Sequence, residues 1–444
     1  MKLEIKKLGI NGEGIAYLRR VPVFVKGALP GEVVEARVSG GDSFLKGELL
    51  KIVKPCGQRV DSPCPYSKEC GACGLIHANY ALQLEAKKAI LEESLAKYAG
   101  IDADVEIIAN EQIFGYRNEL KMPFGYRDGR LVTGLYSVAS NRFVALDNCL
   151  IHDPLLEQLR KRILEVLNGF DLAVYDRKLR RGLRFLILRM IDGRAQLCLV
   201  TGDDLLPKEL IKRLSVLDGL QSIYQSVNTS RDAGELFGRS LKLLWGERFL
   251  ELDYEGLKIN LSMRSFYQLN SLQTHKLYGL VTSKVKADNE LIVEAYSGVG
   301  IMSLLLAKRA KRIVGIEYIR DAVDNANNNA KINGMANLSF VAGDSAEVIS
   351  RMFRKNVIDY LIVDPPRSGL DEAMLATLLH AKINNIIYVS CSPSSLAKNL
   401  AVLKQRYYIN SIEAIDMFSN SAHVETVVLL SRKIQTDKTV SFCR

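Results

Sequence analysis

The sequence predicts a multidomain protein with an N-terminal OB-like β-barrel, a central α+β domain and a C-terminal α/β domain. Three observations carry this prediction. Short strands bounded by glycines fill the N-terminal part, strands and helices mix between about 110 and 260, and strands alternate with helices from about 289 onward. A chain of 444 residues has room for two or three domains. We place the domains at 1–54, 55–260 and 261–444.

Composition narrows the class of protein. Hydrophobic residues make up 48% and charged residues 25%, which predicts ordinary packed cores. The net charge of +10 suits a polyanionic partner, most often nucleic acid, although a basic protein without such a partner is the alternative. We find no signal peptide and no apolar run of membrane-spanning length. The eight cysteines therefore predict a reducing compartment, and we expect a cytoplasmic protein, away from membranes and monomeric.

The first 54 residues alternate turn and strand signals. Gly12-Glu-Gly14, Val23-Phe-Val25, Gly31-Glu-Val-Val34 and Gly47-Glu-Leu-Leu50 predict a small barrel of about five strands. Ten lysines and arginines against six acids favour RNA binding over a barrel without a ligand.

The central region carries a cysteine motif, a helix and a basic run. The three clustered thiolates of Cys64-x5-Cys70-x2-Cys73 can, together with one distant thiolate, hold a [4Fe–4S] cluster or a zinc ion, and the spacing alone does not choose between them. Apolar residues at helical spacing predict a helix at 79–99, which we expect to pack on the C-terminal domain. Residues 177–184 hold five cations and no acid, and this run suits either phosphates or a solvated face. We assign structural roles to Cys56, Cys198 and Cys443.

The C-terminal region has the rhythm of an open, mainly parallel sheet with helices on both faces. Seven strands are expected, at 290–296, 312–317, 337–341, 358–364, 385–391, 407–414 and 424–430.

The ends of these strands predict a cofactor site. Gly298 and Gly300 follow the first strand and permit a tight turn close to a ligand, but Ser303 replaces the third glycine of the dinucleotide fingerprint. Glu317 ends the second strand, where an acid can accept hydrogen bonds from ribose hydroxyls. Asp344 after the third strand could contact an adenine amine, and Asp364 ends the fourth. This layout resembles the S-adenosylmethionine-dependent methyltransferases.

Cys391 is the candidate nucleophile. The apolar strand 386–389 delivers its thiol to the end of the sheet, and Ser392 and Pro393 suit the start of a helix. A helix N-terminus would lower the pKa of the thiol and favour the thiolate. The alternative is a structural cysteine, which would more often be buried inside a strand.

Taken together, these residues resemble the RNA uracil-5 methyltransferases over essentially the whole chain. The barrel is similar to a TRAM domain, and the C-terminal domain to a Rossmann-like class I methyltransferase with a seven-stranded sheet. The matching runs are Ser265-Phe-Tyr-Gln-Leu-Asn270, Glu294-Ala-Tyr-Ser-Gly-Val-Gly300, Val314-Gly-Ile-Glu317, Val363-Asp-Pro-Pro-Arg-Ser-Gly369, Val389-Ser-Cys-Ser-Pro393 and His423-Val-Glu-Thr-Val427.

The resemblance implies a role for each matching residue. Cys391 corresponds to the nucleophile and Glu425 to the base. The resemblance adds Cys149 to Cys64, Cys70 and Cys73, and these four motif cysteines correspond to ligands of a [4Fe–4S] cluster. Phe266 and Arg367 are candidate substrate contacts; Phe266 either stacks on an extruded uracil or packs in the core. Contacts with S-adenosylmethionine are expected from Gln268, Tyr296, Gly298, Gly300, Glu317, Asp344 and Asp364.

The chemistry explains why these residue types are needed. Carbon 5 of uracil is a poor nucleophile, and addition of a thiolate to carbon 6 makes it an enolate carbon that can attack a methyl sulfonium. A base must then remove the proton at carbon 5 so that the enzyme can leave. Glu425 lies in an apolar strand, where burial would raise its carboxyl pKa; a salt-bridged structural acid is the alternative, and His423 is a second candidate base.

Other functions remain open. An RNA cytosine-5 methyltransferase would carry a second cysteine in an Asp-Ala-Pro-Cys run, whereas this chain has Asp364-Pro-Pro-Arg367. Radical S-adenosylmethionine enzymes need a Cys-x3-Cys-x2-Cys loop, and the first gap here is five. A non-catalytic RNA-binding protein is the third alternative. Relatives with both the barrel and the four cysteines usually act on 23S ribosomal RNA, so the resemblance implies that target without naming the uridine.

Overall fold

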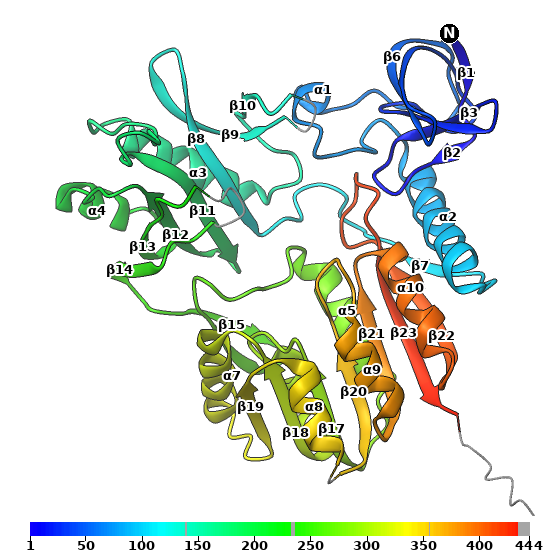
Figure 1. Ribbon diagram of the computed structural model, residues 1–444. Coiled ribbons are helices and arrows are strands. Elements are labelled where there is room, and N and C mark those ends of the chain that lie inside the picture. Colours follow the sequence, from blue (N-terminus) through cyan, green and yellow to red (C-terminus); the bar gives the residue numbers. More distant parts are fainter. Residues whose placement is uncertain (138–139, 232–235, 355, 434–444) are drawn as a thin grey trace, which may run out of the picture. The chain divides into compact units, whose positions relative to one another are not determined.

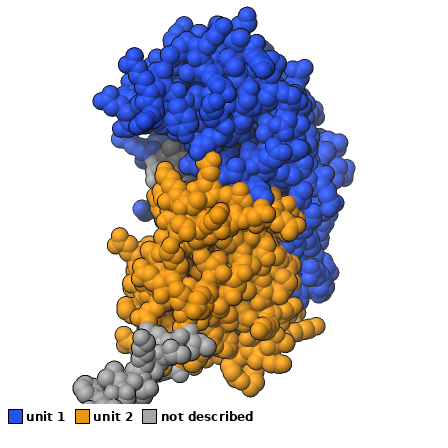
Figure 2. All heavy atoms as spheres, turned by 90° about the vertical axis from the view of Figure 1, so that its right-hand side faces the viewer, with its two compact units in different colours: residues 1–90, 109–276, 416–423 blue, residues 91–108, 277–415, 424–444 orange. Residues whose placement is uncertain are grey.

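The computed structural model of the protein describes residues 1–137, 140–231, 236–354 and 356–433. The chain forms two compact units, each built from segments that are far apart in sequence (Figure 2). Unit 1 comprises 1–90, 109–276 and 416–423, and unit 2 comprises 91–108, 277–415 and 424–444. The boundaries at 54 and 260 stay predictions, and Cys443 lies outside the described residues.

The N-terminal part of unit 1 is a curled sheet with the strand order β1-β5-β6-β4-β3-β2 (Figure 1). Its first segment closes it, because β1 pairs with β5 at one edge and β2 pairs with β3 at the other. One segment therefore supplies two strands, which is why six are present where about five were expected. The strands are β1 (Lys2–Glu4), β2 (Lys7–Leu8), β3 (Gly14–Leu18), β4 (Val21–Val25), β5 (Val33–Gly40) and β6 (Leu45–Lys54).

The rest of unit 1 mixes strands and helices, as predicted. A seven-stranded sheet has the order β10-β9-β8-β11-β12-β13-β14, and helices α3 and α4 share its core. The two-stranded sheet β15-β16 follows. The elements are α1 (Ser67–Cys70), β8 (Glu119–Arg127), β9 (Arg130–Tyr136), β10 (Phe143–Ala145), α3 (Pro154–Leu167), β11 (Leu183–Ile191), β12 (Arg194–Thr201), α4 (Lys208–Ser215), β13 (Leu220–Val227), β14 (Ser240–Gly246), β15 (Leu250–Tyr254) and β16 (Leu257–Leu261). Two further helices, α2 (Tyr80–Ala99) and α5 (Ser271–Ser283), begin in unit 1 and end in unit 2.

Unit 2 is built on a mainly parallel sheet with the order β19-β18-β17-β20-β21-β23-β22-β7. The seven expected strands are present, but the sheet has eight, because β7 (Glu106–Ile108) pairs with β22. β7 was missed because it precedes the other strands by some 180 residues of chain and is only 3 residues long. The others are β17 (Asn289–Ala295), β18 (Ala310–Glu317), β19 (Leu338–Ala342), β20 (Ile358–Val363), β21 (Ile383–Ser390), β22 (Tyr407–Ile415) and β23 (Glu425–Arg432).

Helices cover this sheet and complete its core. Leu91, Leu95 and Ala99, in the second half of α2, belong to the core of unit 2, as expected for the helix at 79–99. Residues of α8, α9 and α10 join the same core. The helices are α6 (Ile301–Leu306) with the short 3₁₀ turn Ala307–Arg309, α7 (Arg320–Ile332), α8 (Ser345–Phe353), α9 (Glu372–His380) and α10 (Pro393–Leu403).

Among the described residues, no helix combines the length and the apolar character that a membrane crossing requires.

Candidate active site

Cys391 and Glu425 meet at one edge of the sheet in unit 2. Cys391 directly follows β21, and Glu425 is the first residue of the antiparallel neighbour β23. The two strands pair Ser390 with Thr426, so one further step in the same register sets Cys391 opposite Glu425. Asp364 follows the parallel strand β20 on the other side of β21 and ends at the same edge. Because the carboxyl ends of parallel strands share one edge, the three predicted side chains are brought together.

The surroundings of Cys391 differ from the sequence prediction. Burial, together with the nearby carboxyl groups of Glu425 and Asp364, raises the pKa of its thiol to about 11, and among the nearby charges only Arg367 acts in the opposite direction. A pKa lowered by the helix N-terminus was expected, and this expectation was wrong. Ser392 occupies the N-cap position of α10, but its hydroxyl pairs with the Ser395 hydroxyl, at 2.7 Å, and caps no backbone N–H.

Glu425 has the environment of a strong base. Its side chain is buried, with 4% of the residue exposed. Burial raises its pKa well above the usual carboxyl value, the nearby Asp364 acts in the same direction, and Arg367 opposes both. Burial raises the pKa of Asp364 as well. A buried carboxylate binds a proton more readily than an exposed one, which is the property expected of the predicted base.

A tight loop between β17 and α6 forms the predicted cofactor corner. Tyr296, Gly298 and Gly300 have positive φ angles of 62°, 54° and 82°. A Cβ on Gly300 would lie 2.4 Å from the ring of Phe340, so only glycine fits there. Space is open around the Cα of Gly298, which leaves the backbone accessible to a ligand.

The acids at the strand ends shape this corner. The carboxylate of Glu317 accepts hydrogen bonds from the backbone N–H groups of Gly298, at 3.1 Å, and Ile319, at 2.9 Å. Asp344 caps α8 by accepting from the backbone N–H of Glu347 at 3.0 Å. Burial, with the charges of Asp371 and Asp344, raises the pKa of Tyr296 to about 12. Protein contacts thus hold the three predicted residues at the same corner.

One pair at this corner was missed from the sequence. Glu294, in β17, accepts hydrogen bonds from both the backbone N–H and the hydroxyl of Ser303 in α6. Burial raises the pKa of Glu294 to about 8. The signal was present in the sequence, because Ser303 stands where the dinucleotide fingerprint has glycine. Its hydroxyl joins the first strand to the first helix instead of leaving space between them.

Three other predicted residues belong to unit 1. Phe266 is 64% exposed, which excludes the core-packing alternative and leaves its ring accessible. Gln268 is buried, and its backbone carbonyl accepts a hydrogen bond from the Asn118 amide at 3.0 Å. His423, the second candidate base, ends the segment 416–423.

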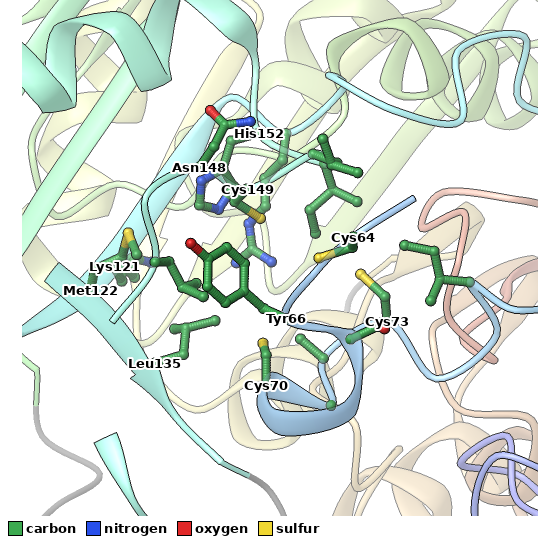
Figure 3. A pocket seen from close by; sticks show the side chains of 18 residues that line it. Cys64, Tyr66, Cys70, Cys73, Lys121, Met122, Leu135, Asn148, Cys149 and His152 are labelled. Atoms are coloured by element: carbon green, nitrogen blue, oxygen red, sulfur yellow. The ribbon is translucent and has the colours of Figure 1, made fainter. Parts of the chain in front are cut away.

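The four motif cysteines of unit 1 line one pocket with a volume of about 80 Å³ (Figure 3). Burial raises the pKa of Cys73 to about 12, and the charges of the other three thiols act in the same direction. Burial also acts to raise the pKa of Cys149, but the hydrogen bond and charge of His152 lower it overall. No group of three or more His, Cys, Asp or Glu side chains in the described ranges is arranged to hold a metal ion, so the metal site stays a prediction.

Comparison with known proteins identifies the family. The family model described as tRNA (Uracil-5-)-methyltransferase matches residues 247–433, and the TRAM domain model matches residues 1–50. A protein of Clostridium tetani called an uncharacterized RNA methyltransferase is 35% identical over 97% of this chain and 95% of its own. A Listeria innocua protein with the same description is 36% identical over 97% of each chain. The chain belongs to the RNA uracil-5 methyltransferase family.

A solved structure supports the same assignment for the fold. The Pyrococcus abyssi tRNA (uracil-54, C5)-methyltransferase, in complex with S-adenosyl-L-homocysteine, matches with a TM-score of 0.78 and 28% identity. The match covers 97% of this chain and all of that one. The protein is therefore an S-adenosylmethionine-dependent RNA methyltransferase with an N-terminal TRAM domain, as the residue patterns predicted.

Proposed function

We propose that the protein transfers a methyl group from S-adenosylmethionine to carbon 5 of uridine in 23S ribosomal RNA, through a covalent bond between Cys391 and carbon 6. The observation that carries this proposal is the pairing of Cys391 with Glu425 at the sheet edge. A nucleophile and a buried base face each other there, and the cofactor loop ends at the same edge of the same sheet.

Each side chain has a defined task in the reaction. The Sγ of Cys391 loses its proton to solvent, and the resulting thiolate bonds to carbon 6, which places the electron pair of the 5,6 double bond in an enolate. S-adenosylmethionine supplies an electrophilic methyl group to carbon 5. Glu425 then takes the proton from carbon 5, the double bond re-forms, and Cys391 leaves as a thiolate. The positive charge of Arg367 favours the ionised forms of Cys391 and Glu425 and so opposes the effect of burial.

Covalent trapping tests this mechanism. RNA containing 5-fluorouridine should form an adduct with the wild-type protein that survives on denaturing gels. In this RNA carbon 5 carries fluorine in place of the hydrogen, so Glu425 has no proton to remove and the adduct cannot break down by elimination. Cys391→Ala should form no adduct while it still binds S-adenosylmethionine. Glu425→Gln should accumulate an adduct with ordinary RNA, since methyl transfer precedes the blocked elimination. If the wild-type protein forms no adduct, the assignment of Cys391 as the nucleophile is wrong. If Glu425→Gln turns over at the wild-type rate, Glu425 is not the base, and His423 is the next residue to test.

The RNA target has two candidates. The barrel together with the four cysteines favours 23S ribosomal RNA, whereas the Pyrococcus abyssi structure, which matches over its full length, is a tRNA enzyme by name. The architecture alone therefore does not separate the two targets. Mapping of 5-methyluridine in RNA from a strain that lacks this gene decides: loss from 23S ribosomal RNA supports the proposal, and loss from tRNA alone replaces it.

We further propose that Cys64, Cys70, Cys73 and Cys149 hold one [4Fe–4S] cluster with a structural role. Their placement around one pocket supports this, because four thiols at a common cavity are the donor set of such a cluster. The proposed reaction includes no oxidation or reduction step, so it does not need the cluster as an electron carrier. The cluster would instead stabilise unit 1 and its RNA contacts.

Metal analysis tests the cluster. Anaerobically purified protein should be brown with about four irons per chain. Replacing one of the four cysteines by serine should lower stability or RNA affinity, whereas Cys198→Ser alters a buried cysteine outside the pocket and should leave the iron content unchanged. If the protein is colourless and contains one zinc ion per chain, the site holds zinc instead of a cluster, and the structural role stands. A methylation rate that follows the reduction state of the iron would contradict the structural role.

A further inference from the structure

The basic run in unit 1 forms a pinned loop ahead of β11. The carboxylate of Asp176 accepts hydrogen bonds from the backbone N–H groups of Lys178 and Leu179, at 2.6 and 2.9 Å. The backbone of Asp176 bonds to that of Arg181 at 2.7 Å, which joins the two sides of the loop. The turn at residues 177–180 is therefore held by its own hydrogen bonds.

A second loop supports the first. The backbone N–H of Asp203 donates to the carbonyl of Arg180 at 2.7 Å, and Gly202 donates to Gly182 at 2.9 Å. A Cβ on Gly202 would lie 2.1 Å from the carbonyl oxygen of Arg180, so the two loops pack backbone against backbone. Side chains add ion pairs, since Arg180 and Arg181 contact Asp203 and Asp204 at 3.5 and 4.0 Å. These contacts fix the loop's shape before any ligand binds.

This rigid loop presents an apolar tip among cations. Leu179 is 71% exposed, and the exposed Arg177 and Lys178 precede it directly. One exposed leucine needs no explanation by itself. A leucine fixed on a rigid turn and flanked by positive charges is different, because the cations draw in phosphates while the apolar side chain gains by leaving water. Stacked bases between two phosphate backbones offer that combination.

We propose that Leu179 is a wedge that enters the base stack of the bound RNA, while Arg177 and Lys178 contact its phosphates. Apolar side chains that enter a nucleic-acid stack separate neighbouring bases, and phosphate contacts offset the cost of this unstacking. The inference rests on the proposed function, since a methylated uridine must leave its stack to meet the nucleophile.

Unstacking can be measured without methyl transfer. The probe is an RNA stem-loop with 2-aminopurine beside an internal loop, whose fluorescence rises when the base unstacks. We expect saturating wild-type protein to raise the fluorescence, Leu179→Met to do the same, and Leu179→Ala to lose most of the rise. Leu205→Ala is the matched control, because Leu205 is 92% exposed on the supporting loop but follows two acids, where Leu179 follows two cations.

Two further readouts separate the tasks within the loop. Arg177→Gln with Lys178→Gln should weaken RNA binding and reduce the slope of log affinity against log salt by about 1.4 to 1.8, as expected for two lost phosphate contacts. The second readout is methyl transfer to folded ribosomal RNA taken from a strain that lacks the gene. We expect Leu179→Ala to be about tenfold slower or more, because a tenfold loss in rate corresponds to only about 1.4 kcal/mol, less than the free energy of separating two stacked bases. Leu205→Ala should keep the wild-type rate.

The outcomes distinguish this inference from the proposed function. If Leu179→Ala gives the same fluorescence rise and the same methylation rate as the wild type, the proposed role of Leu179 is wrong and the methyltransferase assignment is unaffected. A saturating wild-type protein that does not unstack the probe also overturns the wedge. A wild-type protein that unstacks the probe in a Leu179-dependent way but methylates no RNA supports the wedge and overturns the proposed function. Unchanged thermal unfolding of each variant checks that its effect is local.

Discussion

At the scale of single residues, the reactivity of Cys391 is set by what surrounds it rather than by the helix that follows. A helix N-terminus favours a thiolate, but the effect is confined to the first turn and is modest. Burial and the two nearby carboxylates outweigh it and raise the thiol pKa. The free enzyme therefore keeps Cys391 largely protonated near neutral pH, and Arg367 is the side chain that eases its ionisation.

This arrangement predicts the pH dependence of alkylation at Cys391. Since the thiolate reacts and the thiol pKa is about 11, the thiolate fraction should rise about tenfold per pH unit between pH 7 and 9 without a plateau. An ordinary cysteine, with a pKa near 8.5, would level off close to pH 9. Iodoacetamide labelling, followed on the Cys391 peptide by mass spectrometry, measures this directly.

Arg367→Gln provides the control for this measurement. Removing the cation should raise the thiol pKa further and slow labelling at every pH in that range. A labelling rate that saturates below pH 8 would contradict the raised pKa and restore the helix N-terminus as the dominant influence.

At the scale of elements, the loop between β17 and α6 depends on close packing against β19. Gly300 has a φ of +82° and lies against the ring of Phe340, which stands on β19. Phe340 also lies against Gly315 in β18, so one ring packs on two glycines. This contact holds the predicted cofactor loop on the sheet without using a side chain of the loop itself.

Gly300→Ala should therefore destabilise unit 2 and weaken binding of S-adenosylmethionine. The left-handed backbone costs about 1–2 kcal/mol for alanine, and the overlap with Phe340 adds about 1–3 kcal/mol. Gly334→Ala is the matched control, because its φ is +67° but nothing lies within 4 Å of the added Cβ. It should lose about 1–2 kcal/mol only. Urea unfolding followed by circular dichroism measures both, and equal losses would show that the ring moves aside.

At the scale of the whole molecule, a buried ion pair joins segments of unit 1 that are more than 300 residues apart in sequence. Lys87, in the first half of α2, pairs with Asp416, and neither side chain is exposed. Asp416 also accepts hydrogen bonds from the hydroxyls of Tyr80 and Ser419, both at 2.7 Å. The pair thus holds the segment 416–423 on α2, and that segment leads directly to Glu425.

Lys87→Met should cost about 3–5 kcal/mol, because it leaves a buried carboxylate without its cation. The double variant Lys87→Met with Asp416→Asn should recover most of the loss, since the amide oxygen can still accept from Tyr80 and Ser419 without carrying a charge. Trp245 is the single tryptophan and lies in unit 1, so its fluorescence during urea unfolding reports on this unit. A double variant as unstable as Lys87→Met would show that the charge pair is not the cause.

The sequence by itself indicated the residues to which we assign the chemistry. Cys391 and Asp364 each follow an apolar strand and Glu317 ends one, and parallel strands bring their carboxyl ends to one edge whatever the details of packing. The family, the TRAM domain and the strands at 290–296 through 424–430 could be recognised for the same reason, since they depend on local pattern and spacing. The four motif cysteines were also found to line one pocket, as their grouping suggested.

Only the tertiary structure decided what depends on contacts between distant segments. The antiparallel strand β23 lies between β21 and β22, and this order, which no local pattern encodes, sets Glu425 opposite Cys391. The raised thiol pKa follows from that placement, because charge acts through space and not along the chain. The eighth strand, the Glu294–Ser303 pair and the support that residues 202–204 give to the loop of Leu179 have the same origin, because each needs a partner that the fold supplies.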